Sequence, residues 1–263
     1  MGMTPMFFGP GEALYGSYHA PAPGTPGVET ALVVCQSIGH EYMRGYRACW
    51  QLAEAAAERN AHVLRFDYPA TGDSAGRQVE ADWQSWLASV DRAIDWLGEI
   101  TGLAHIRLIG VRAGSLIAAA AAARRQQSRR VVLIDPVVDG ERYMADLSTL
   151  HVAQIDGMNR YRPRRHHHAT YDTDEWLGFH WPKAVVEPLK AQRLAEIDSE
   201  RLDDWHLATS QGQAQPELAQ SVIARGGQSI ELTETWDWDQ LEAQYRRITL
   251  ARSLSSLLDL SLG

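Results

Sequence analysis

The sequence predicts an α/β protein in which a mostly parallel sheet is covered by helices on both faces. Short apolar runs alternate with helical patterns over residues 1–139, and this alternation is typical of parallel strands joined by crossover helices. The run Thr30–Gln36 ("TALVVCQ") is apolar almost throughout, as expected of a strand buried on both faces.

We expect the first strand over Glu12–Pro21, antiparallel and at an edge of the sheet. After the strand at Thr30–Gln36 come an amphipathic helix over Tyr46–Arg59 and a strand over Ala61–Tyr68. Large apolar residues at helical spacing predict a helix over Asp82–Leu97. Two further buried strands and the helix between them are expected over His105–Val111, Arg130–Val138 and Ala113–Arg125.

The alternation fails after Asp139, where a polar, aromatic and irregular segment follows. We interpret residues 140–200 as a cap insertion and residues 1–139 and 201–263 as the core domain. Its aromatic residues are typical of a cap that roofs an apolar pocket. The last elements expected are two strands, a helix between them and a long final helix: Asp203–Ser210, Ser229–Thr235, Gln215–Gly226 and Asp237–Leu260.

Composition narrows the function classes. The net charge of −8 over 263 residues argues against nucleic acid or an anionic membrane as the main partner. Two cysteines indicate reduced thiols and a cytoplasmic location. We find no signal-peptide pattern, and the longest apolar run, Gly114–Ala123, is too short to span a bilayer.

The segment Arg164–Ala169 ("RRHHHA") suggests a metal site at first sight. Three consecutive histidines cannot all face one ion from a helix or strand, and zinc ligands normally come from separated positions. We therefore expect an exposed loop here, with no metal and no cofactor.

The stretch Leu108–Ser115 ("LIGVRAGS") has the outline of a nucleophile elbow, in which a serine sits in G-x-S-x-G between a strand and a helix. Here the central position is Arg112, between Gly110 and Gly114. A guanidinium stays protonated and has no acceptor lone pair, so it cannot attack a carbonyl.

Four segments together resemble the α/β-hydrolase superfamily: Leu32–Arg47, His62–Gly76, Leu108–Ala120 and Val131–Leu147. They look like a serine-aminopeptidase-like branch whose members are associated with exosortase systems and biosynthetic clusters. That branch typically shows arginine in G-x-R-x-G. The resemblance covers Phe7 to about Leu147 well and the rest loosely. The resemblance implies substrates from polysaccharide, polyketide or peptide assembly. An acyl or peptidyl carrier protein is one expected way of delivering such a substrate.

The other triad positions are also vacant. An acid is expected after the strand Asp203–Ser210, where the chain reads Gln211–Gln213, and a histidine after the last strand, where it reads Glu234–Asp237. No histidine occurs after His206. We expect Ser115 to cap or pack within its helix, and Cys35 and Cys49 to be buried and inert; a Cys35 thiolate with His40 as base is the less favoured alternative.

A fixed cation at a helix N-terminus needs an anion nearby. The internal choices are Glu41, Asp67 and Asp135, and the external choice is a ligand carboxylate or phosphate. We prefer a Glu41–Arg112 pair, which is either a structural buttress or a proton-handling site. For Arg44 a solvated and a functional role stay open.

Two hypotheses from different classes follow. In the first, the chain is an enzyme without a serine nucleophile that binds an acyl or carboxylated small molecule and performs acyl transfer, ester or thioester cleavage, or a related step. In the second, it binds the same kind of ligand without turnover; a misread serine hydrolase is the third, least favoured reading. The sequence is also compatible with a homodimer.

The candidate catalytic residues are Arg112, Glu41 and His40. The candidate substrate-binding residues are Ser37, Arg44, Val111, Ala113, Asp135, Trp176 and Trp236.

Overall fold

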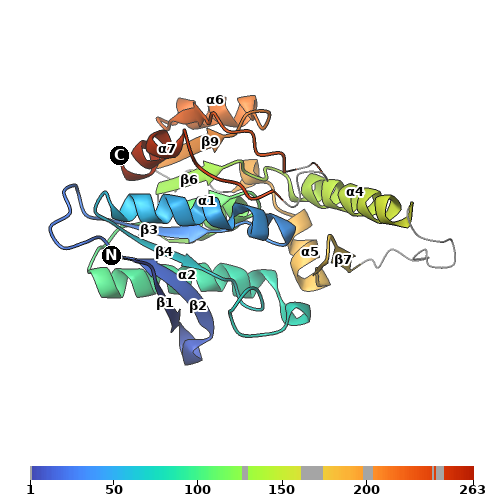
Figure 1. Cartoon of the computed structure of the whole chain (residues 1–263), viewed down its shortest axis with the longest axis horizontal. Coiled ribbons are helices and arrows are strands. Elements are labelled where there is room, and N and C mark those ends of the chain that lie inside the picture. Colours follow the sequence, from blue (N-terminus) through green and yellow to red (C-terminus); the bar gives the residue numbers. More distant parts are fainter. Residues whose placement is uncertain (1, 126–129, 161–173, 198–203, 239, 241–245) are drawn as a thin grey trace.

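The computed structural model describes residues 2–125, 130–160, 174–197, 204–238, 240 and 246–263. An eight-stranded sheet forms its centre, in the order β1-β2-β4-β3-β5-β6-β9-β10 (Figure 1). All neighbours from β4 to β10 pair in parallel, whereas β2 pairs antiparallel with β1 and β4. The strands are β1 (Thr4–Phe8), β2 (Leu14–His19), β3 (Thr30–Cys35), β4 (Ala61–Phe66), β5 (Ile106–Val111), β6 (Arg130–Ile134), β9 (Asp204–Thr209) and β10 (Ser229–Glu231).

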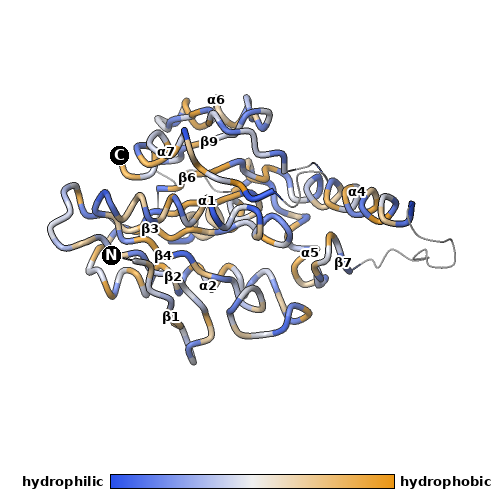
Figure 2. The backbone as a smooth tube through the Cα atoms, in the orientation of Figure 1, coloured by the Kyte–Doolittle hydropathy of each residue, from blue (hydrophilic) through white to orange (hydrophobic). Residues whose placement is uncertain are grey.

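Helices cover both faces of the sheet, which confirms the predicted fold class. Two separate apolar clusters lie on the two faces, and β3 and β6, at the centre of the sheet, are coloured strongly hydrophobic in Figure 2. One cluster includes α1 and α7, and the other includes α2 and α3. The helices are α1 (His40–Ala57), α2 (Trp83–Thr101), α3 (Gly114–Arg124), α4 (Gly140–Asn159), α5 (Lys183–Lys190), α6 (Pro216–Ala224) and α7 (Leu254–Leu262).

The inserted segment is more regular than we expected. It forms the twenty-residue helix α4, then a hairpin of β7 (Glu175–Trp176) and β8 (Phe179–His180), then α5. These elements gather at one end of the molecule (Figure 1). Asp139 caps α4, because its side chain accepts the N–H of Arg142. The division into core and cap at residues 140 and 200 stays a prediction.

Three expected elements need correction. The strand expected at the edge is β2, and the true edge is β1, whose mostly exposed residues carry little apolar pattern. Helix α1 begins at His40, six residues before the predicted start, because the left-handed backbone of Gly39 ends the preceding loop. The prediction of one long final helix is wrong over residues 246–253, which are not helical. Helix α7 begins only at Leu254.

The start of α7 has a physical cause. The Glu234 carboxylate accepts the backbone N–H groups of Ala251, Arg252 and Ser253, which fixes the turn from which α7 begins. Just before it, the N–H of Ile248 donates to the carbonyl of Arg44 in α1. Within the ranges given above, no helix combines the length and the apolar character needed to cross a membrane.

Candidate functional site

The segment after β5 is an elbow in its backbone as well as in its sequence. Arg112 has a φ of +52°, a conformation that a long side chain adopts only under constraint. A Cβ at Gly110 would clash with Ser115, and one at Gly114 would clash with the carbonyl of Cys35. The two glycines therefore allow β5, the turn and α3 to pack closely, as in a nucleophile elbow.

The side chain of Arg112 forms the predicted ion pair with Glu41. Its Nε lies 2.8 Å from Glu41 Oε1, and Tyr143 donates its hydroxyl to Glu41 Oε2 at 3.1 Å. The exposed fraction is 7% for Arg112 and 1% for Glu41. The guanidinium carbon also lies 5.2 Å from the ring centre of Trp238 and 5.9 Å from that of Tyr143. The anion that answers the elbow cation is thus part of the protein.

Asp135, which follows β6, has a carboxylate fully engaged by protein donors. It accepts the N–H of Ser210 at 2.6 Å, the hydroxyl of Ser210 at 2.7 Å and the indole N–H of Trp238 at 2.7 Å. Burial raises the pKa of Asp135, and the donors from Ser210 and Trp238 oppose this rise. These donors hold the carboxylate against Ser210 and Trp238, and its role in substrate binding stays a prediction.

Trp238 is the site residue that sequence reasoning missed. It follows β10, in the loop where hydrolases with this elbow hold their histidine. Trp238 contacts both Arg112 and Asp135, and Asp135 follows β6, not β9, after which the triad acid was expected. An indole has one N–H donor and no basic nitrogen, so it cannot accept the proton of a nucleophile.

The alternative nucleophiles are unsuited to attack. Ser115 is fully buried and donates its hydroxyl to the carbonyl of Gly110 at 2.9 Å. Burial raises the pKa of the Cys35 thiol to about 12 and that of Cys49 to about 11. Both cysteines are buried, as expected, and a raised pKa favours the protonated, less nucleophilic thiol at neutral pH.

The remaining candidate residues lie in several parts of the fold. Val111 and Ala113 flank Arg112 and are buried, Ser37 lies in the loop between β3 and α1, and His40 starts α1. Trp176 packs against Trp181 in the inserted segment. The structure places the last two candidates in protein contacts, and their roles in substrate binding stay predictions. Arg44 donates to the carbonyls of Asp237 and Trp238 and so holds the C-terminal loop, and Trp236 is buried in the apolar cluster beneath α1 and α7.

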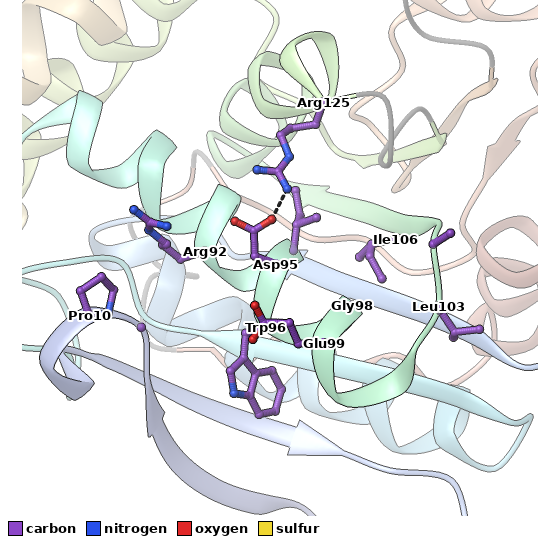
Figure 3. Close-up of a pocket in the computed structure, with 12 residues that line it drawn as sticks. Pro10, Arg92, Asp95, Trp96, Gly98, Glu99, Leu103, Ile106 and Arg125 are labelled. Carbon is purple, nitrogen blue, oxygen red and sulfur yellow. Dashed lines mark hydrogen bonds and ion pairs between the residues drawn. The ribbon is translucent and has the colours of Figure 1, made fainter.

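A hollow of about 380 Å³ opens beside the elbow. Arg112 and Tyr143 line it, together with Arg142 and Asp146 of α4 and the segment 212–215 after β9. A larger hollow of about 720 Å³, shown in Figure 3, is lined by Trp96, Glu99 and the Asp95–Arg125 ion pair. It includes Ile106, the first residue of β5, so it lies at the end of the sheet opposite the elbow.

No cluster of three or more metal-ligating side chains occurs among the residues that the structure describes. The histidines of Arg164–Ala169 lie outside those residues, so the expectation of an exposed loop there stays a prediction.

Comparison with solved structures shows the fold. The α/β hydrolase GrgF from Penicillium sp. sh18 has a TM-score of 0.62 at 12% identity, covering 100% of this chain and 99% of that one. Est1E from Butyrivibrio proteoclasticus has a TM-score of 0.59 at 13% identity (98% and 95% covered), and the thioesterase domain from the curacin biosynthetic pathway 0.56 at 14% (100% of each). No family model and no curated sequence matches the chain. The chain has the α/β-hydrolase fold.

Proposed function

We propose that this chain binds an acyl or carboxylated small molecule in the hollow at Arg112 and acts in the acyl chemistry of a biosynthetic pathway without a serine nucleophile. Acyl transfer and cleavage of an ester or thioester are the reactions proposed, with a carrier protein as one donor of the acyl group. The observation that carries the proposal is the position of Arg112, at the elbow and on the wall of a hollow of about 380 Å³.

The fold supports the reaction class. The similar structures include an esterase and a thioesterase domain from a biosynthetic pathway. In this fold the elbow lies at the carboxyl ends of the strands, next to the N-terminus of the following helix. Arg112 lies two residues before Gly114, the first residue of α3, so the helix N-terminus and the guanidinium both favour negative charge on a bound acyl or carboxyl group.

A second candidate, a binding protein without turnover, is favoured by the state of Glu41. Both carboxylate oxygens of Glu41 accept hydrogen bonds, from Arg112 and Tyr143, and the side chain is almost fully buried. To act as a base it would have to leave Arg112, and separating a buried pair costs several kcal/mol, roughly 3–5. The pair therefore serves more readily to hold the elbow than to move a proton.

Thioester turnover separates the two candidates. Purified protein is incubated with a series of acyl-N-acetylcysteamine thioesters while released thiol is followed, and the matching free acids are titrated by calorimetry. The enzyme proposal predicts thiol release that is lost when Arg112→Met and Glu41→Gln are combined. This double variant removes the charged pair without leaving either charge alone. Arg225→Gln, at an exposed arginine that does not line this hollow, is the control and should retain turnover.

Binding of the acids without thiol release would select the binding-protein candidate. Binding and turnover that are both unchanged in the double variant would contradict the assignment of the site to Arg112.

A further inference from the structure

A second hollow, of about 360 Å³, lies between the loop after β3 and the loop after β4. It shares no lining residue with the hollow at Arg112. Its size is within the range of small-ligand sites, which begins at roughly 300 Å³. The inference below concerns this hollow alone and does not depend on the function proposed for the elbow.

Asp67 lines this hollow and is 4% exposed. Its Oδ1 accepts the hydroxyl of Tyr42 at 2.7 Å, and its Oδ2 accepts the backbone N–H of Asp73 at 3.0 Å. Both donors are neutral, and no salt bridge to Asp67 occurs among the residues that the structure describes. A carboxylate has room for about four donors, so each oxygen can accept a further hydrogen bond.

Arg65, two residues before Asp67, forms no salt bridge with it. Its Nε donates to His19, and its guanidinium carbon lies 4.7 Å from the ring centre of Tyr46. Burial raises the pKa of Asp67, and Arg65 opposes this only as the weakest of the contributions. A buried carboxylate that lacks a cation is energetically costly, and a cationic ligand would relieve that cost.

The walls of the hollow are aromatic. Tyr42, Phe66, Tyr68 and Phe179 line it, and its described lining contains no lysine, arginine or histidine. Aromatic faces attract ammonium groups through their quadrupoles. Gly72 brings the loop close over Asp67, because a Cβ at this position would clash with the carboxylate.

We propose that this hollow is a binding site for a small molecule that carries a protonated amine on an apolar body about the size of one aromatic ring. The ammonium group contacts the Asp67 carboxylate, and the apolar body packs between Tyr42, Phe66, Tyr68 and Phe179.

The test uses three probes of nearly equal shape, titrated by calorimetry at neutral pH. They are 2-phenylethylamine, which is an ammonium there, the uncharged 2-phenylethanol and the anion phenylacetate. The proposal predicts that the amine binds at least about tenfold more tightly than either of the others, because it alone gains the ion pair and the cation–π contacts. Equal binding of amine and alcohol to the unmodified protein would overturn the proposal, and this comparison needs no variant.

Two variants locate the site. Asp67→Asn removes the charge at nearly constant size and should lower amine affinity about tenfold, to that of the alcohol. Glu58→Gln removes one negative charge from an exposed side chain that does not line the hollow and should leave the affinity unchanged. Unchanged amine affinity in folded Asp67→Asn would refute the site. Should that variant not fold, Phe179→Ala, at a half-buried wall residue, replaces it with the same expectation of loss.

The double variant at Arg112 and Glu41 keeps this test separate from the proposed function. It should bind 2-phenylethylamine as the unmodified protein does, because neither residue lines the hollow. Loss of amine binding in that variant would contradict an independent site.

Discussion

Arg112 is held by contacts on several sides, from Glu41, from the carbonyl of Asp135 and from the rings of Tyr143 and Trp238. The guanidinium and the Glu41 carboxylate are both buried, so neither charge has water as an alternative partner. At the scale of the residue, the elbow thus contains a compensated ion pair in the position of a nucleophile.

Replacing one member of this pair should lower the stability of the fold almost as much as, or more than, replacing both. Arg112→Met or Glu41→Gln alone should each lower the free energy of unfolding by about 3–5 kcal/mol, because the partner charge stays buried. The double variant should lose much less than the sum of the two. Urea unfolding of the four proteins measures the coupling, and additive losses would show that the pair contributes nothing as a pair.

Trp238 and Trp236 provide a matched comparison. Trp238 donates its indole N–H to Asp135, whereas the N–H of Trp236 has no hydrogen-bond partner among the described residues. Trp238→Phe should therefore cost about 1–3 kcal/mol more than Trp236→Phe, since it leaves the buried carboxylate of Asp135 one donor short. Thermal unfolding of both variants measures the difference, and equal losses would remove Asp135 from the account of this site.

At the scale of the element, Glu234 is the residue that starts α7. Hydrogen bonds from Ser253, Arg252 and Ala251 lower its pKa to about 2, from an ordinary value of 4.5. A carboxylate whose pKa is depressed by folding stabilises the folded state above its unfolded pKa, and that stabilisation is lost as the pH falls towards the folded pKa.

The contribution of Glu234 should therefore be fully present at pH 6 and decline between about pH 4.5 and pH 2. Glu234→Gln should speed amide hydrogen exchange of residues 251–253 at pH 6. At pH 2 to 2.5 it should differ much less from the unmodified protein. Slow exchange in the variant at pH 6 would mean that α7 does not need this cap.

Elements with a strong apolar pattern could be predicted from the sequence, and those defined by distant contacts could not. Strands β3 to β6 and helices α2 and α3 follow their apolar residues. Strand β1 is mostly exposed, and the segment before α7 is shaped by bonds to Glu234 and Arg44, which lie far away in the chain.

The same division holds within the site. The Arg112–Glu41 pair was predictable, because an elbow cation next to a helix N-terminus needs an anion and the facing loop offers one. Trp238 was not predictable, because the sequence around it reads as a helix and only the folded loop brings its indole to Asp135.

At the scale of the whole molecule, the fold of the similar esterases and thioesterases is retained across the full chain. Its elbow carries a cation, the nearby Asp135 carboxylate is bound to an indole, and Ser115 is buried and bonded to the backbone. We propose that a molecule built in this way does not form a serine acyl-intermediate.

Labelling with a fluorophosphonate probe, read by intact mass, tests that claim most directly. Fluorophosphonates react with serines activated by a neighbouring base, and the elbow here presents none. We predict no mass increase after prolonged incubation with excess probe, alongside a serine esterase that labels fully. A stoichiometric adduct mapped to a single serine of this chain would contradict the account.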